Sequence, residues 1–445
     1  MSEQVSGLFL SLSACKDLGI VSQDFPLPVP VFPPESTTQQ NKQQKASVAA
    51  CGTPRVREQE SAQLAECGCP IRAAPPSPPT ECPPGLGTQE QLEGWILSRY
   101  AASAFNVCQH QVLPSMQGEP LNIVMNKSAR PVASHIPTPV PIHWQEEVKS
   151  GLERDVEIGV LEKVPVNTPT EWLHRMVLAP KHDGSPRRTI DLQPLNDESF
   201  RQTHYTPSPW QCAAAVPRNT YKTKLDAWNA FHSVELTPES QKLTSFATMW
   251  GTYRYRKAPM GYLATGDAYT HRYDNIVKDI KHISKCVDDV CLWGESLEEA
   301  FIRTCQYLTH CTQNGIIFNP EKFEMGRESV DFVGFELTKD GIKPMQETLQ
   351  SIRDFPAPTD ITGVRSFFGL IQQVSYAFTM TKPMAPFREL LKSSSRFYWD
   401  DVLQELFNQA KEVIIKEIEK GVKTFDKKRT TCIATDWRAA RRAGS

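Results

Sequence analysis

The chain has 445 residues, of which 40% are hydrophobic, so it can form two to four domains with substantial cores. Its 49 basic and 51 acidic residues nearly balance, so bulk charge neither predicts nor excludes a nucleic-acid partner. No apolar run approaches the roughly 18 residues of a membrane span, and the first residues lack the basic start of a signal peptide. We therefore expect an intracellular protein, cytoplasmic or nuclear, that is not secreted and does not enter a membrane.

Residues 31–88 are rich in proline, glutamine, serine and glutamate, as in "STTQQNKQQK" and "PPSPPTECPPG". Such segments bury too little apolar surface to fold, so we expect a largely disordered linker. The 12 cysteines are scattered, as in proteins of a reducing compartment. The irregular spacing of the possible zinc ligands argues against a zinc site. These candidates are Cys51, Cys67, Cys69, Cys82 and His110.

Residues 89–135 are expected to form a helix and an extended lead-in to the main domain. In "TQEQLEGWILSRYAAS", Leu92, Trp95, Ile96 and Tyr100 lie on one helical face. The main region begins near residue 136. There a second set of apolar residues recurs every fourth position and predicts an amphipathic helix. This set is Trp144, Val148, Leu152 and Val156.

The following segments predict a mixture of strands and helices. "MVLAPKHDGSPRRTIDL" is typical of strand, Asp-Gly turn and strand, and "TKLDAWNAFHSVEL" of a strand, a short bend and a second strand. "TSFATMWGTYRYRKAPMG", "KCVDDVCLWG" and "SVDFVGFELTKDGIKP" each predict a hairpin. "LATGDAYTHRYDNIVKDI" predicts a helix, and "SLEEAFIRTCQYLTHCTQNG" predicts a helix that ends at Gly315. From about residue 344 to 420 the chain is mostly helical. Because strands and helices do not alternate strictly, the predicted class is α+β.

Asp288 and Asp289 lie side by side in the apolar stretch "KCVDDVCLW". One interpretation is an acidic hairpin tip, because aspartate is favoured in tight turns. The alternative is a cation site, because carboxylates held at a turn can bind Mg²⁺. Asp226 ends another apolar strand, where it either caps the strand or joins the pair. Three converging carboxylates would need cations to ionise together, and two Mg²⁺ ions about 3.5–4 Å apart would form a phosphoryl-transfer site.

Other residues allow a functional and a plain interpretation. Lys181 and Arg187 flank the predicted turn "KHDGSPRR", either to grip a polyphosphate or as a solvated basic hairpin. Phe231 follows Asp226 by five positions and either floors a nucleotide pocket or belongs to the core. In "PMG", Met260 precedes Gly261, where the main chain can approach a ligand closely.

These segments, in this order, resemble a reverse transcriptase, most closely the Pol polyproteins of gypsy-class LTR retrotransposons. The match extends over roughly residues 136–430. The resemblance implies a right-hand polymerase with a ferredoxin-like palm. Its domains would be fingers and palm (136–340), thumb (341–392) and connection (393–430).

The resemblance implies RNA-directed DNA synthesis by two Mg²⁺ ions, with Mn²⁺ as a possible substitute, on a primed RNA or DNA template with dNTPs. Asp226 and Asp288 would bridge both ions, and Asp289 would support them. Lys181 and Arg187 would grip the triphosphate, Phe231 would exclude ribonucleotides, and Met260 with Gly261 would lie beside the nucleotide. The segment matching the primer grip comprises Phe332, Val333, Gly334 and Phe335.

The ends of the chain resemble fragments of neighbouring Pol domains. Residues 1–30 are similar to the tail of an aspartic protease without its catalytic motif. Residues 431–445 resemble the start of an RNase H domain, with Asp436 at its first metal carboxylate. We therefore expect neither protease nor RNase H activity from this chain.

Cys286 stands where the family has tyrosine, a residue that packs near the primer terminus. We expect this departure to affect primer affinity or fidelity rather than metal binding. Two hypotheses follow: an active reverse transcriptase fragment, or a non-catalytic, decaying or co-opted remnant that binds nucleic acid. Primer extension on an RNA template separates them.

Overall fold

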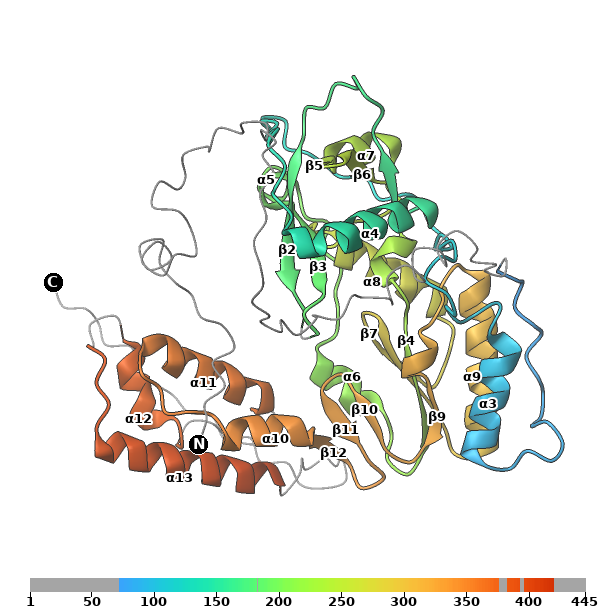
Figure 1. Cartoon of the computed structure of the whole chain (residues 1–445). Helices are drawn as coiled ribbons and strands as arrows, with labels where there is room; N and C mark the ends of the chain where they lie inside the picture. Colours follow the sequence, from blue (N-terminus) through green and yellow to red (C-terminus); the bar gives the residue numbers. More distant parts are fainter. Residues whose placement is uncertain (1–71, 182, 376–381, 393–395, 420–445) are drawn as a thin grey trace, which may run out of the picture. The chain divides into compact units, whose positions relative to one another are not determined.

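The computed structural model describes residues 72–181, 183–375, 382–392 and 396–419. These residues form a five-stranded, a four-stranded and a three-stranded sheet, followed by a set of helices (Figure 1). The predicted protease remnant, Cys51, Cys67, Cys69, the strand expected at "RTTCIATDW" and Asp436 lie outside the described residues. No helix in the described ranges is both long and apolar enough to cross a membrane.

The five-stranded sheet has the strand order β1-β6-β5-β2-β3. Its strands are β1 (Leu161–Lys163), β2 (His174–Pro180), β3 (Pro186–Asp191), β5 (Phe246–Thr248) and β6 (Gly251–Tyr255). The expected β2–β3 and β5–β6 hairpins are confirmed, and β2 joins β5 in parallel. The nearby helices are η1 (Ile142–Trp144), α4 (Gln145–Glu157), α5 (Gln193–Asp197) and α7 (Pro238–Leu243), whereas α6 (Pro209–Ala215) packs against the four-stranded sheet.

The four-stranded sheet has the order β7-β8-β4-β9, and all its neighbours are antiparallel. Its strands are β4 (Tyr221–Asp226), β7 (Ile283–Cys286), β8 (Asp289–Gly294) and β9 (Glu324–Arg327). The associated helices are η2 (Ala230–Ser233), α8 (Thr265–Val277), α9 (Leu297–Gln313) and η3 (Pro320–Lys322). With β5 and β6 set aside as an insertion, the chain order β4-α8-β7-β8-α9-β9 is that of a split βαβ unit, as the predicted ferredoxin-like palm requires.

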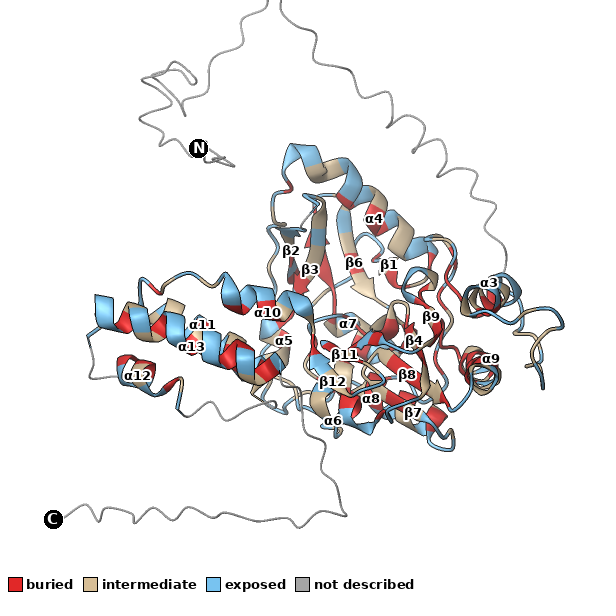
Figure 2. Cartoon of the chain, turned by 90° about the horizontal axis from the view of Figure 1, so that it is seen from below, coloured by how far each residue is buried: buried red, intermediate tan, exposed pale blue. Residues whose placement is uncertain are grey.

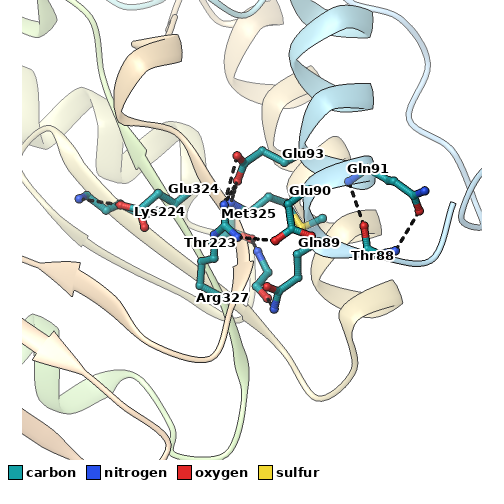
Figure 3. A network of polar contacts seen from close by, with 11 residues as sticks. Thr88, Gln89, Glu90, Gln91, Glu93, Thr223, Lys224, Glu324, Met325 and Arg327 are labelled. Atoms are coloured by element: carbon teal, nitrogen blue, oxygen red, sulfur yellow. Dashed lines mark hydrogen bonds and ion pairs between the residues drawn. The ribbon is translucent and has the colours of Figure 1, made fainter.

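Helix α3 (Gln89–Tyr100) covers the outer edge of this sheet beside α9 (Figure 1). Figure 3 shows how its polar side chains bind β9, an edge strand whose free backbone groups need partners. Glu93 accepts a 2.9 Å hydrogen bond from the Met325 amide and pairs with Arg327 at 3.0 Å. Gln89 donates to the Gly326 carbonyl at 2.6 Å. The predicted helix is therefore an integral part of the sheet's surface.

Residues 72–88 do not form the disordered linker that composition predicted. Arg72 donates to the carbonyls of Ser103 and Phe105 at 3.0 and 3.1 Å. The Pro76 carbonyl accepts a 3.0 Å hydrogen bond from the Thr309 hydroxyl of α9. The segment is extended and gains its order from contacts with distant parts of the chain, which composition does not encode.

A three-stranded antiparallel sheet follows, where one hairpin was expected. Its strands are β10 (Val330–Phe332), β11 (Phe335–Leu337) and β12 (Ile342–Pro344). The last part of the chain is helical as predicted, with its own core (Figure 2). Its elements are α10 (Gln346–Arg353), α11 (Ile361–Val374), α12 (Ala385–Arg388), η4 (Glu389–Leu391) and α13 (Asp401–Glu419).

Two local predictions are wrong. After β4 the chain does not bend into a second strand but forms the short helix η2, and Glu235 and Leu236 make only isolated bridges. In α4, Val148 and Leu152 are buried as expected, whereas Val156 near the helix end is 37% exposed. In both places local periodicity competes with tertiary packing, and the packing decides.

Candidate active site

The three predicted carboxylates meet where β4 ends and the β7–β8 hairpin turns. Asp226 is the last residue of β4 and pairs directly with Asp289, the first residue of β8. The amide of Ala227 donates to the carbonyl of Asp288 at 3.0 Å, which ties the strand end to the hairpin tip. The buried residues Leu225, Val290 and Leu292 fix this register, because a one-residue slip would bring the aspartates into the core.

The hairpin turn itself is conformationally strained. Cys286 pairs with Asp289, so Val287 and Asp288 form a two-residue loop. Val287 has φ of +57°, a left-handed conformation that β-branched residues rarely adopt. Such strain costs about 1–3 kcal/mol and persists only where the surrounding structure enforces it, typically at functional sites. In this turn, the left-handed Val287 places the Asp288 carbonyl where it accepts the hydrogen bond from the Ala227 amide.

The carboxylates repel one another in the absence of a cation. Burial, followed by the charges of Asp288 and Asp226, raises the pKa of Asp289 from 3.8 to about 6. Burial and then the charge of Asp226 also raise the pKa of Asp288. Directly opposed like charges on paired strands are destabilising. A positive charge at this end of the sheet would therefore reduce the repulsion among the carboxylates.

Lys322 supplies part of that charge. Its Nζ lies 2.7 Å from Oδ2 of Asp226, and this hydrogen bond is the largest cause of the raised pKa of the Lys322 ammonium. The lysine side chain is 57% exposed, so it can leave the carboxylate without a large burial cost. Sequence reasoning missed Lys322, because "NPEK" resembles an ordinary charged turn and the ion pair joins residues 96 positions apart.

The donor chemistry suits a divalent cation, although the side chains are not closed around one. Within the described ranges, no three histidine, cysteine, aspartate or glutamate side chains are gathered into a metal-holding group. The aspartates nevertheless offer the hard oxygen ligands that Mg²⁺ prefers, and the raised pKa values of Asp288 and Asp289 are of the kind that a nearby cation would lower. Asp226, Asp288 and Asp289 therefore fit such an ion if Lys322 yields and their side chains rotate inward.

The raised pKa of Asp289 predicts a specific pH dependence of stability. The carboxyl favours the folded state while protonated, and this advantage is lost as pH rises from about 4 through about 6. After a discount for solvent screening, Asp289→Asn should stabilise the metal-free protein by about 1–2 kcal/mol at pH 7 and have little effect at pH 4. Thermal unfolding at both pH values measures this. Equal effects at the two pH values, or the same profile from the exposed Asp279→Asn control, would refute the assignment.

Phe231 lies on η2, the short helix that follows β4. Its half-buried ring packs edge-on against Tyr269 of α8, with 5.7 Å between centroids. Burial raises the pKa of Tyr269 well above its usual value, and the charges of Asp288 and Asp226 add to this shift. Tyr269 is therefore in contact with the Phe231 ring and close enough to the acidic cluster to be affected by its charge.

Met260 and Gly261 form an exposed turn before α8. Gly261 has φ of +90°, which glycine adopts readily, and Met260 is 42% exposed. Asn196 fixes this turn by donating to the Gly261 carbonyl and accepting from the Leu263 amide, both at 2.9 Å. Sequence reasoning missed Asn196, whose two bonds fix the turn on which Met260 is exposed.

Lys181 and Arg187 are both exposed at the tip of the β2–β3 hairpin. The tip is closed by a 2.8 Å hydrogen bond from the Lys181 amide to the Ser185 carbonyl. The next residue, Arg188, instead turns inward and pairs with Asp155 of α4. The hairpin therefore presents two cations to solvent, and their contact with the carboxylates stays a prediction.

The predicted primer grip is the β10–β11 turn. Phe332 and Phe335 are paired and buried, and Val333 and Gly334 between them both have positive φ. The two phenylalanine side chains are thus buried in the core on which the turn rests. A bound nucleic acid can contact only the half-buried Val333 and the exposed Gly334.

Comparison with protein families identifies one conserved domain. Residues 180–337 match the model described as reverse transcriptase (RNA-dependent DNA polymerase). This range contains the three aspartates, Lys322 and the β10–β11 turn.

Curated relatives are transposon polyproteins. The chain is 27% identical over 296 residues to the retrovirus-related Pol polyprotein from transposon 297 of Drosophila melanogaster, covering 64% of this chain and 26% of that protein. The chain is 26% identical over 240 residues to the retrovirus-related Pol polyprotein from transposon gypsy of the same organism. This match covers 52% of this chain and 23% of that protein. The chain thus spans about a quarter of the length of these relatives. The predicted resemblance to gypsy-class Pol is confirmed.

Solved structures share the fold. A foamy viral protease-reverse transcriptase dRH in complex with ds DNA aligns with a TM-score of 0.67 and 17% identity, over 84% of this chain and 62% of that chain. The foamy viral protease-reverse transcriptase in complex with RNA/DNA hybrid aligns with a TM-score of 0.65 and 18% identity. This alignment covers 84% of this chain and 48% of that chain. These likenesses confirm the predicted right-hand polymerase fold.

Proposed function

We propose that the domain matched by the reverse transcriptase model, which is similar to those of retrotransposon Pol polyproteins, is an RNA-directed DNA polymerase. It would add deoxynucleotides to the 3′-hydroxyl of a primer. The observation that carries the proposal is the meeting of Asp226 with the Asp288–Asp289 hairpin, which leaves carboxylates with raised pKa values at one point of the sheet.

Reverse transcriptases generally use divalent metal ions, and two Mg²⁺ ions, or Mn²⁺ in their place, would supply positive charge to the primer hydroxyl and the phosphates. Asp226 and Asp288 would hold both ions, with Asp289 as support. Before they bind, Lys322 neutralises Asp226 and limits repulsion among the carboxylates. The role of the protein is then chiefly to position the reactants and neutralise charge.

The remaining residues would bind the nucleotide and the primer. Lys181 and Arg187 are exposed cations suited to a triphosphate, and Arg187 can bind phosphate oxygens through two donors. Phe231 would lie under the sugar and exclude the ribose 2′-hydroxyl. Met260 and Gly261 would contact the nucleotide, and the turn at Val333 would contact the primer strand.

The partners proposed are a primed RNA or DNA template and dNTPs, in an intracellular location. Two of the structurally similar foamy viral proteins are in complexes with double-stranded DNA and with an RNA/DNA hybrid. Their shared fold supports a nucleic-acid partner for this chain. The thumb-like helices after residue 344 would contact the duplex through its backbone, independently of sequence.

Primer extension on an RNA template with dNTPs and Mg²⁺ tests the proposal. We expect the wild-type chain to extend the primer. Cys286→Tyr, which restores the residue usual in the family, should improve primer affinity and leave the metal requirement unchanged. Extension by the variant alone would refute activity of this chain, and the natural Cys286 would be the cause. If both proteins fold and bind nucleic acid but extend nothing, the chain is a non-catalytic remnant.

A further inference from the structure

Two cysteines meet at the back of the catalytic hairpin. Cys212 lies in α6, and Cys286 is the last residue of β7, directly before the strained turn. The Ser284 hydroxyl donates to the Cys212 carbonyl at 2.7 Å, and the Cys212 thiol donates to the Lys285 carbonyl at 3.2 Å. These bonds hold α6 against two successive residues of β7. The Cys286 side chain packs against the same small core to which Cys212 belongs.

The two thiols differ in their access to solvent. Cys212 is 3% exposed and belongs to the small core under β10 and β11, whereas Cys286 is half-buried at the margin of that core. A small oxidant can therefore reach Cys286 first, and the buried thiol of Cys212 lies in the adjoining core, bonded to the carbonyl of the residue before Cys286. An accessible cysteine beside a second one is the arrangement of a redox-responsive pair.

We propose that Cys212 and Cys286 form a reversible disulfide that joins α6 to the hairpin carrying Asp288. With hydrogen peroxide as oxidant, the Cys286 sulfur takes one peroxide oxygen to become a sulfenic acid, and the thiol proton leaves with the other oxygen as water. The Cys212 sulfur then attacks the sulfenic sulfur, the S–S bond forms, and a second water carries away the hydroxyl and the Cys212 proton. Two cysteines are thereby oxidised and one peroxide is reduced. A dithiol restores both thiols by exchange.

The bond would act next to Asp288. Cys286 is paired with Asp289 and precedes Val287, so a covalent link at Cys286 restrains both the turn and the first residue of β8. The carboxylates must come closer together to hold a shared cation, and a hairpin fixed to α6 would allow this movement less readily. Loss of polymerase activity on oxidation therefore also rests on the proposed function, whereas formation of the disulfide does not.

Peptide mass mapping of the full chain after hydrogen peroxide treatment tests the disulfide directly. We expect a cross-linked peptide pair containing Cys212 and Cys286 that disappears with dithiothreitol. The oxidised protein should unfold several degrees higher, because the cross-link restricts the unfolded chain. Cys212→Ser should give neither effect. Cys82→Ser, which removes a half-buried cysteine from the N-terminal segment, is the matched control and should give both.

Three outcomes overturn the disulfide. These are a Cys286 that stops at sulfinic or sulfonic acid with Cys212 reduced, a cross-link to another cysteine, and a cross-linked mass that persists in Cys212→Ser. If Cys212→Ser unfolds early when reduced, Cys286→Ser replaces it in the mapping. In primer extension, oxidation should reduce the rate at least several-fold for wild type and Cys82→Ser but not for Cys212→Ser. A mapped disulfide without this difference refutes the restraint on the hairpin, whereas an inactive reduced chain refutes only the proposed polymerase.

Discussion

Asp288→Asn is expected to reduce primer extension by on the order of 10³-fold or more, the scale seen when one group that stabilises transition-state charge is removed. The asparagine side chain keeps the size of aspartate but loses the negative charge that would hold the metal ions. The fold should survive, because the contact that ties Asp288 to Ala227 uses the backbone carbonyl, which the substitution leaves unchanged. Steady-state extension rates and thermal unfolding of the same preparations measure the two effects.

Without metal, Asp288→Asn should be as stable as wild type or slightly more stable, because one repelling carboxylate is gone. Mg²⁺ should raise the unfolding temperature of the wild type and have much less effect on the variant, since a ligand stabilises only the state that binds it. Asp279→Asn, the same chemical change at an exposed position after α8, is the matched control and should resemble wild type. Retention of a tenth or more of the wild-type rate by Asp288→Asn would refute the assignment.

The carboxylates were predictable from sequence because each contradicts its surroundings. Asp288 and Asp289 interrupt an apolar stretch, and Asp226 ends another, so burial cost alone marks them as exceptional. The hairpins around them follow from alternating apolar residues and turn-forming residues. The register that pairs Asp226 with Asp289 then follows from which strand residues must be buried.

The residues that sequence reasoning missed act through contacts between distant segments. Lys322 joins Asp226 across 96 positions, and Asn196 joins Gly261 across 65. Neither has an unusual local environment in the sequence. The left-handed Val287 was also unpredictable, because a β-branched residue in a tight turn contradicts local preference and is enforced by the pairing of its neighbours.

The difference between local sequence pattern and contacts between distant segments also explains where the predicted fold was wrong. The segment from residue 72 to 88 has the composition of a linker, yet it is held by side chains of the α3–α9 region, such as Thr309. After β4, alternating apolar residues predicted a strand, but Ala230 and Ser233 are buried in a short helix beside α8. Composition and periodicity describe what a segment can do alone, and these two segments are determined by what packs against them.

Phe231→Ala should relax the choice between deoxyribonucleotides and ribonucleotides by on the order of 10–100-fold, a range typical of changes in pocket volume. The Phe231 ring is half-buried and rests on Tyr269, whose own environment includes the charges of Asp288 and Asp226. An alanine leaves space where the ring was, close to the carboxylates that would hold the metal ions. A ribose 2′-hydroxyl that the ring would exclude can then enter that space.

Single-nucleotide incorporation of a dNTP and its matching rNTP measures the ratio of kcat/KM for the two substrates. Phe231→Ala should change this ratio through faster rNTP incorporation, with dNTP incorporation reduced less than tenfold. Tyr269→Phe is the matched control: it keeps the ring that supports Phe231 and removes a buried hydroxyl that has no hydrogen-bond partner in the described structure. That variant should keep the wild-type ratio. An unchanged ratio in Phe231→Ala would place the ring in the core alone, whereas a changed ratio in Tyr269→Phe would show that discrimination depends on the whole aromatic pair and its distance from Asp288.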